Sequence, residues 1–453
     1  MPELRARRPP PPFAAEAEPE PPQARPAHRS TNKWLVAIVV LALAARILIA
    51  VATQSWVFAD RWHYGFEMGA IASSIAAGNG FSWPGNPPRP TAWMPPTYPF
   101  VMAGVFKVFG IFSKPSAVVL ELMQAILSAL TCLLVYAVGK RVFNARAGLL
   151  AAFLFAVYPP SIHFAVQKIW GTTLVVFCLF VILLLFLKLA DNPTTRRALA
   201  LGAVLGFTAL LDPVILGAIP FAFVWLYLRI GRDKRRLART AVITVVTLLA
   251  VCSPWVVRNY VTLGQFVFIK SNFGNELYKG NNPTATGIDA VQVREAQDAL
   301  RGKLQASGQA EDEAQQNAVL LRRAVAFIAD HPDQFAKFTG LRILAFWTNI
   351  RGKSQDPEAR GLVAAIYFAL LALALAGLAF RSGRTPDAWL LWIFVLTLPL
   401  PYYITVIVDW RYRFPVEAIL IVLAGNTLDQ ALRWWKRRAA APAALGYSTA
   451  AQT

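Results

Sequence analysis

Apolar runs of about 20 residues recur along the chain, and they restrict its possible folds more than any other feature of the sequence. A helix of that length crosses the hydrocarbon core of a bilayer. Hydrophobic residues make up 56% of the 453 residues, against about 45–50% in a soluble domain. The sequence therefore predicts an all-α polytopic membrane protein of about 10–11 transmembrane helices, with juxtamembrane helices on its outer face. The clear spans are 34–53, 116–139, 145–161, 170–189, 197–212, 213–230, 238–254, 361–380, 387–404 and 412–431.

Lysine and arginine are concentrated in the short connections between these spans. Such residues mark cytoplasmic loops, and the spans alternate without conflict if all these connections and both termini are cytoplasmic. The run 97–112 is short and contains Lys107, so we expect a re-entrant or interfacial helix there and a second one at 335–347. The basic connections are 139–146, 192–197, 229–239, 381–384 and 433–438.

This orientation places polar, aromatic and proline-rich residues on the outer side of the membrane, where we expect the active or binding site. The predicted units are a disordered cytoplasmic tail (1–32), an N-terminal transmembrane module (33–254) with an outer loop (54–115), a non-cytoplasmic loop region (255–360), C-terminal transmembrane helices (361–432) and a cytoplasmic tail (433–453). Within the loop region, residues 311–335 are predicted to form an amphipathic helix with a docking or acceptor-side role.

The net charge of +20 does not indicate nucleic-acid binding. The basic residues lie beside the spans, where they keep the connections on the cytoplasmic side and contact anionic membrane lipid. The three cysteines lie within apolar runs without metal-ligand spacing, as expected for buried, inert thiols. The sequence has no GxxxxGKS/T, HExxH or CxxC pattern, so ATP hydrolysis and the usual zinc sites lack support and no metal ligand is assigned.

The first outer loop contains a polar helix face. Residues 60–77 are predicted to be helical, and four polar side chains then share one side, at i, i+3, i+4 and i+7. They are Asp60, His63, Tyr64 and Glu67. A carboxylate on this face is suited to act as a general base toward a hydroxyl acceptor. The alternative is a solvated polar face without a catalytic role.

Arginines at the outer ends of two spans run against the usual charge distribution. Arg258 follows the span 238–254, and Arg411 and Arg413 are next to the last span. Guanidinium groups there are suited to grip a lipid phosphate. The alternatives are that Arg258 only extends to the interface and that Glu417 pairs with one of the last two arginines inside the bundle.

Other residues near the outer ends of the spans are candidates for a substrate pocket or for structural roles. Trp93 and Tyr98 are either interface anchors or a wall for a sugar ring or a polyprenyl chain. A lone histidine such as His163 is more often a hydrogen-bonded structural residue than a ligand. Asp212 precedes Pro213 and is expected to cap a helix.

Four stretches, in their order along the chain, resemble the bacterial GT-C-type membrane glycosyltransferases of the dolichyl-phosphate-mannose protein mannosyltransferase-like group (family 39). They are GFEMGAIASSIAAGNGF (65–81), PPTYPFVMAGVFKVFG (95–110), SPWVVRNYVTLGQFVFIKSNFGNELYKGNN (253–282) and RYRFPVEAILIVLAG (411–425). The resemblance covers most of residues 34–432. It implies a GT-C-like helical bundle in the bacterial inner membrane. The implied activity is transfer of a sugar from a polyprenyl-phosphate donor, on the outer face, to a hydroxyl of a protein, lipid or glycan.

The resemblance also implies roles for individual residues. Many relatives have paired acids early in the loop helix, and alignment at GNGF places those acids on His63 and Tyr64 of this chain. Glu67 lies one turn later and Asp60 one turn earlier, so we expect Glu67 to be the catalytic base with Asp60 as its partner. The implied donor-phosphate ligands are Arg258, Arg411, Arg413 and Lys270, and the implied pocket residues are His63, Tyr64, Trp93, Tyr98, His163 and Asn272. The donor is the polyprenyl-phosphate sugar itself, and a divalent metal is the one cofactor left open.

Two other functions remain open beside the glycosyltransferase. A flippase or transporter of lipid-linked sugars is expected to place polar residues near the bilayer midplane and to show half-to-half symmetry. Here the polar residues collect on one side and no internal repeat is visible, which favours the enzyme. The third reading is a non-catalytic assembly protein whose outer loops bind a partner.

Overall fold

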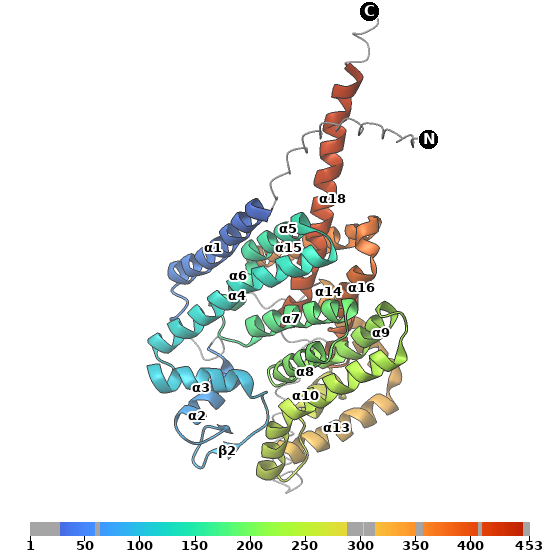
Figure 1. Ribbon diagram of the computed structural model, residues 1–453. Helices are drawn as coiled ribbons and strands as arrows, with labels where there is room; N and C mark the ends of the chain where they lie inside the picture. Colours follow the sequence, from blue (N-terminus) through green and yellow to red (C-terminus); the bar gives the residue numbers. More distant parts are fainter. Residues whose placement is uncertain are drawn as a thin grey trace, which may run out of the picture.

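The computed structural model describes residues 28–58, 64–287, 302, 313–348, 357–405 and 410–446. These residues form a bundle of tilted helices (Figure 1) with a single two-stranded antiparallel sheet among them. The elements are α1 (His28–Thr53), α2 (Phe66–Ala76), β1 (Ser82–Trp83), β2 (Arg89–Pro90), α3 (Thr97–Phe109), α4 (Lys114–Val142), α5 (Ala145–Val157), α6 (Pro159–Val166), α7 (Thr172–Asp191), α8 (Thr195–Ala209), η1 (Pro213–Ala218), α9 (Ile219–Arg229), α10 (Lys234–Leu263), α11 (Phe273–Gly280), α13 (Glu313–Asp330), α14 (Pro332–Thr348), α15 (Pro357–Ala376), η2 (Gly377–Ala379), η3 (Arg381–Arg384), α16 (Pro386–Thr397), α17 (Leu400–Ile404), η4 (Trp410–Tyr412) and α18 (Phe414–Gly446).

Six of the described helices have both the length and the apolar composition to cross a bilayer. They are Asn32–Thr53, Lys114–Val142, Thr172–Asp191, Lys234–Leu263, Gly361–Ala379 and Pro386–Ile404. The bent pair α5 and α6, with 52° between the two helices, is a seventh span if it crosses as one. The predicted helical membrane bundle is therefore confirmed. Fewer spans meet both criteria than the ten or eleven predicted, because predicted spans such as 197–212 and 213–230 form shorter helices, α8 and η1–α9. The run 97–112 likewise forms the short helix α3.

The core of the bundle is built around the first half of α18. Every residue from Val416 to Ala424 is between 0% and 3% exposed, so this stretch is enclosed on all sides by neighbours that include α5, α15 and α16. Small residues let the backbones approach: a Cβ on Gly425 would lie 2.8 Å from the Ala147 carbonyl oxygen. Close contact of this kind is a principal source of helix association in a bilayer.

A fully buried arginine joins α1 to the bundle. Arg46 donates to the Ala156 carbonyl (2.9 Å) and to the hydroxyls of Ser128 (2.9 Å) and Ser161 (3.0 Å). The Ala156 carbonyl is at the C-terminal end of α5, where Pro159 begins α6 and the α-helical ladder is interrupted. The guanidinium therefore satisfies the broken end of α5, a role that the sequence analysis of span 34–53 did not foresee.

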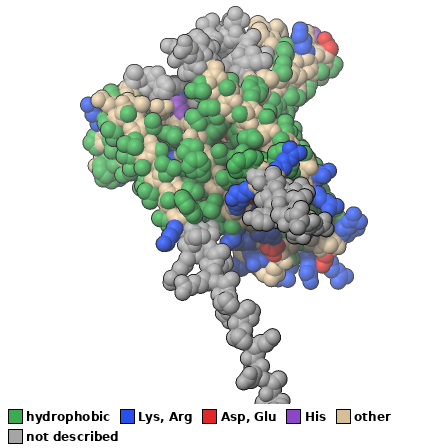
Figure 2. Space-filling model, turned by 90° about the horizontal axis from the view of Figure 1, so that it is seen from above, with side chains coloured by type: hydrophobic (Ala, Val, Ile, Leu, Met, Phe, Trp, Pro, Cys, Tyr) green, Lys and Arg blue, Asp and Glu red, His purple; other side chains and the backbone are tan. Residues whose placement is uncertain are grey.

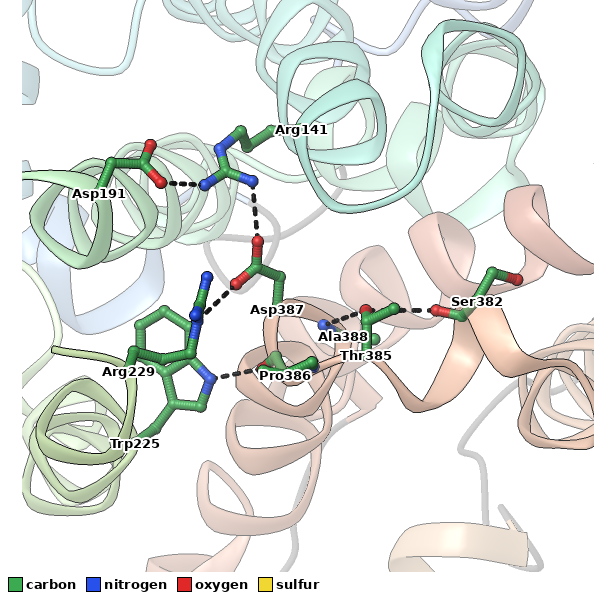
Figure 3. Close-up of polar contacts among 9 residues, drawn as sticks. All are labelled: Arg141, Asp191, Trp225, Arg229, Ser382, Thr385, Pro386, Asp387 and Ala388. Carbon is green, nitrogen blue, oxygen red and sulfur yellow. Dashed lines mark hydrogen bonds and ion pairs between the residues drawn. The ribbon is translucent and has the colours of Figure 1, made fainter. Parts of the chain in front are cut away.

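One end of the bundle, which we call the arginine-rich end, is held by direct ion pairs. Arg141 of α4 donates to Asp191 of α7 and, at 2.8 Å, to Asp387 of α16 (Figure 3). Arg229 of α9 donates to the other oxygen of Asp387 at 3.0 Å. These contacts bring together two of the basic connections predicted to share one side of the membrane, 139–146 and 229–239. Lysine and arginine side chains gather beside a broad apolar surface in Figure 2.

Candidate functional site

A different set of polar groups lies at the opposite ends of α4, α7, α8 and α10. The first of these groups along the sequence is Glu67. Glu67 lies in the first turn of α2, where the helix dipole favours a carboxylate. The helix begins after Gly65, whose φ of 77° and closeness to Met102 leave room only for glycine. The indole Nε1–H of Trp93 donates to Glu67 Oε1 at 2.8 Å, so the carboxylate is half-buried and oriented. Asp60 and His63 lie outside the described residues.

The segment Thr91–Trp93 connects Glu67 to two cationic residues. The Arg258 guanidinium donates to the carbonyls of Thr91 and Phe81, both at 2.6 Å. The N–H of Ser271 donates to the Ala92 carbonyl at 2.9 Å, which places the neighbouring Lys270 backbone beside the same segment. Glu67, Arg258 and Lys270 are therefore brought together around three consecutive residues. Arg258 is engaged with backbone oxygens there.

The charge of Lys270 also acts on a further carboxylate, that of Asp212. Asp212 follows α8 and accepts from the Val214 N–H at 3.2 Å, which confirms the predicted cap. Burial raises the pKa of Asp212 above its ordinary value, and the charge of Lys270, the Val214 N–H and the charge of Arg411 offset part of that rise. Asp212 therefore lies in the field of two cations that belong to distant parts of the sequence.

A second carboxylate acts on Lys270 from α11. Burial works to raise the pKa of Glu276, but the ammonium groups of Lys279 and Lys270 outweigh it and leave that pKa below its ordinary value. Lys279 Nζ lies 2.8 Å from Glu276 Oε1. The charge of Lys270 thus acts on two carboxylates, those of Asp212 and Glu276.

Arg411 lies against aromatic rings. Its guanidinium carbon is 3.6 Å from the centroid of Trp170, and its Nη2 donates to the Tyr412 hydroxyl at 2.8 Å. The Tyr412 ring stacks in turn on Tyr402, with the centroids 4.5 Å apart. Lys168 Nζ lies 5.6 Å from the same Trp170 ring. Aromatic faces hold cations in place without neutralising their charge.

Arg413 is placed inside the bundle. Its Nε donates to Glu417 at 2.5 Å and its guanidinium lies 3.6 Å from the Tyr367 ring. Glu417 also accepts from the Tyr158 hydroxyl at 2.8 Å. The predicted alternative, in which Glu417 pairs with one of the two arginines, is confirmed for Arg413.

The remaining predicted pocket residues are held by their own neighbours. The Tyr64 hydroxyl hydrogen-bonds Ser116 of α4 at 2.5 Å, and burial raises the pKa of Tyr64 to about 12. The Tyr98 hydroxyl donates to Gln124 at 2.8 Å. His163 Nδ1 lies 2.7 Å from Gln167 Oε1. Asn272 is buried at the start of α11, two residues from Lys270.

Three acidic residues of this region, Asp212, Glu276 and Glu313, were not predicted as site residues. Asp212 was foreseen only as a cap. Glu313, the first residue of α13, accepts hydrogen bonds from four groups of the segments that carry Trp93 and Lys270. Its only signal in the sequence is its place at the start of a predicted amphipathic helix. Among the described residues, no group of three or more His, Cys, Asp or Glu is arranged to hold a metal ion.

The comparison with family models agrees with the resemblance found in the sequence. Residues 94–257, which run from Met94 to the C-terminal part of α10, match the family described as Dolichyl-phosphate-mannose-protein mannosyltransferase. No curated protein sequence matches the chain.

The fold is similar to that of an archaeal enzyme. AglB oligosaccharyltransferase from Archaeoglobus fulgidus, in complex with an inhibitory peptide and a dolichol-phosphate, has a TM-score of 0.56 and 18% identity over 92% of this chain and 52% of that chain. The Archaeoglobus fulgidus oligosaccharyltransferase in complex with Zn and sulfate gives 0.54 and 17% over 92% and 51%. ArnT from Cupriavidus metallidurans bound to undecaprenyl phosphate gives 0.41 and 14% over 89% and 78%. This chain thus spans about half the length of the archaeal oligosaccharyltransferase. The predicted GT-C-like bundle is confirmed.

Proposed function

We propose that this chain, with its match to the dolichyl-phosphate-mannose-protein mannosyltransferase family over residues 94–257, transfers a sugar from a polyprenyl-phosphate donor to a hydroxyl acceptor on the outer, periplasmic face of the inner membrane. The observation that carries the proposal is the convergence of Glu67, Lys270 and Arg411. They come from distant parts of the sequence. Hydrogen bonds of Trp93 and Ser271 join Glu67 to the segment that carries Lys270, and the charges of Lys270 and Arg411 both act on the Asp212 carboxylate.

The chemistry assigned to these residues follows from their surroundings. Glu67, oriented by Trp93, takes the proton of the acceptor hydroxyl as the oxygen attacks the anomeric carbon. The bond to the phosphate oxygen breaks through an oxocarbenium-like transition state. Lys270 and Arg411 bind the phosphate of the donor and hold the negative charge that increases on it as the polyprenyl phosphate departs.

The other predicted residues take supporting roles in this proposal. Arg258 fixes the backbone of Thr91 and Phe81, and Arg413 stabilises the bundle through Glu417. Asp60 remains the proposed partner of Glu67.

The sidedness of the proposal rests on charge. The arginine-rich end is assigned to the cytoplasm by the positive-inside rule, and both termini with it. The site lies at the other ends of α4, α7, α8 and α10, which supports the assignment of the site to the periplasmic side. A polyprenyl-phosphate carrier is supported by the similarity to AglB, whose structure contains a dolichol-phosphate.

The test is a transfer assay with the purified full-length protein in lipid vesicles, with radiolabelled polyprenyl-phosphate sugars and hydroxyl-bearing acceptors. Wild-type protein is expected to transfer label, and Glu67→Gln is expected to lose transfer while it still binds the donor. Asp333→Asn, which changes an exposed carboxylate at the start of α14, is the matched control and should retain wild-type rates.

Three outcomes contradict parts of the proposal. Wild-type turnover by Glu67→Gln excludes the base role. Movement of the intact donor across the bilayer without transfer supports a flippase. Absence of both transfer and donor binding supports an assembly protein.

A further inference from the structure

The carboxylate of Glu313 connects the two parts of the proposed site. Its Oε2 accepts from the Thr91 hydroxyl at 2.5 Å and from the Trp83 indole at 3.3 Å. Its Oε1 accepts from the Ala92 N–H at 3.0 Å and from the Ser271 hydroxyl. One side chain of α13 thus bonds both to the loop that carries Trp93 and to the segment that carries Lys270.

The bonded groups are the immediate neighbours of the proposed catalytic machinery. Ala92 precedes Trp93, whose indole orients Glu67. Ser271 follows Lys270, and its N–H also donates to the Ala92 carbonyl. A displacement of either segment therefore changes the distance between the Glu67 carboxylate and the Lys270 ammonium.

The charge of Glu313 is balanced locally. The Arg258 guanidinium, which donates to the Thr91 carbonyl, interacts electrostatically with the Glu313 carboxylate. Four donors and a nearby cation satisfy a half-buried carboxylate. Loss of the carboxylate leaves these donors without this acceptor, and the two segments are then joined by the bond from the Ser271 N–H to the Ala92 carbonyl without the support of Glu313.

We propose that Glu313 is a positioning residue for the transfer reaction, which sets the separation between the base Glu67 and the phosphate-binding Lys270 by bonding to Thr91, Ala92 and Ser271. The inference rests on the proposed function, because it assigns Glu313 a role in that same site. Glu313 itself makes no contact with the reacting atoms in this scheme.

The experiment compares Glu313→Ala and Glu313→Gln with two controls from the same helix. Asn317→Ala removes a side chain that docks α13 on α11 through the Gly274 and Asn275 N–H groups. Asp330→Asn removes an exposed negative charge at the other end of α13. The Asn317 bonds to Gly274 and Asn275 do not involve Thr91, Ala92 or Ser271, the residues that Glu313 joins.

A positioning role predicts that kcat falls while the donor KM stays nearly unchanged. Because a misplacement of about 1 Å lowers a rate by roughly 10²-fold, kcat of Glu313→Ala should fall about 10- to 100-fold, while the donor KM stays within about threefold. Glu313→Gln retains one acceptor oxygen and should be intermediate. Both controls should keep the wild-type kcat. The acid limb of the kcat–pH profile should stay where it is in the wild type, because Glu67 still supplies the base.

Amide hydrogen exchange gives a reading that does not depend on activity. Exchange should accelerate at Ala92 and Ser271 in Glu313→Ala and remain as in the wild type in both controls. Equal loss of kcat in Asn317→Ala, or unchanged exchange at Ala92 and Ser271, overturns the positioning role while the transferase proposal stands. A wild-type chain that transfers no sugar removes the transferase proposal, and a positioning role in transfer falls with it.

Discussion

The two ends of the bundle use acidic side chains in different ways. At the arginine-rich end, Asp387 accepts from two guanidinium groups, those of Arg141 and Arg229. At the proposed site, Glu67 accepts from a neutral indole. Arg411 lies against the Trp170 ring, an aromatic face that leaves its charge in place.

This difference separates charges that hold the structure together from charges that remain effective toward a ligand. A carboxylate held between two arginines is costly to separate from them. A carboxylate oriented by a neutral indole is suited to act as a general base. The comparison therefore predicts that substitutions at the arginine-rich end lower stability and leave catalysis unchanged. Substitutions at the proposed site should lower catalysis and leave stability nearly unchanged.

The largest effect is expected for Glu67→Gln. Loss of the base should lower kcat by about 10²- to 10⁴-fold, and the thermal midpoint should change little because the amide oxygen still accepts from Trp93. Steady-state kinetics and thermal denaturation in the same detergent check this. A large fall in the midpoint without loss of kcat would assign Glu67 to the structure.

The next effect is expected for Arg411→Gln. Removal of a charge-assisted contact to phosphate, of about 1.5–3 kcal/mol, should raise the donor KM roughly 10- to 100-fold. Arg229→Gln at the other end is the matched control and should leave the donor KM unchanged. Titration of both variants with polyprenyl-phosphate sugar distinguishes them, and equal KM values would remove Arg411 from the phosphate site.

Asp387→Asn is expected to act on stability alone. The substitution leaves Arg141 and Arg229 without a shared counter-ion, and since both guanidinium groups are about one-third exposed, we expect a loss of about 1–3 kcal/mol in the free energy of unfolding. Thermal or denaturant unfolding measures this loss. Transfer kinetics should match those of the wild type. A fall in kcat comparable to that of Glu67→Gln would contradict the assignment of a purely structural role to the arginine-rich end.

The smallest effect is a pH dependence at Asp212. Because its pKa in the folded protein is raised, the carboxyl contributes stability that is fully present below its ordinary pKa and is lost as the pH rises through the raised value. Asp212→Asn, which does not titrate, should therefore lose this dependence. The difference in thermal midpoint between the variant and the wild type, followed from acid to neutral pH, should shift in favour of the variant. A constant difference would contradict the raised pKa.

Much of the fold follows from patterns that are local in the sequence. Apolar length predicted the six described helices that can cross a bilayer, but it also predicted spans such as 197–212 that form shorter helices. The basic connections predicted that Arg141, Arg229 and their neighbours share one end. The cap at Asp212 and the Arg413–Glu417 pair depend on residues within four positions of each other. Such contacts are available to sequence reasoning because helix geometry fixes them.

The site was only partly predictable, because its decisive contacts join distant segments. Glu67, Lys270 and Arg411 were expected from residue type and resemblance. The bonds of Glu313 to Thr91 and Ala92 cross more than 220 positions of sequence, and no periodicity indicates them. The start of α2 at Phe66 also differs from the predicted helix 60–77, because the left-handed Gly65 precedes it.

Arg46 has a consequence for how the chain is made. A lone arginine in the middle of an inserting helix costs about 2.5–3.5 kcal/mol at the translocon. Its acceptors Ser128, Ala156 and Ser161 are synthesised 82 to 115 residues later, which takes several seconds at roughly 5–20 residues per second. We expect nascent α1 to remain beside the insertion machinery until the later helices emerge. Release of the first helix into lipid would then follow the synthesis of the helices that carry its hydrogen-bond acceptors.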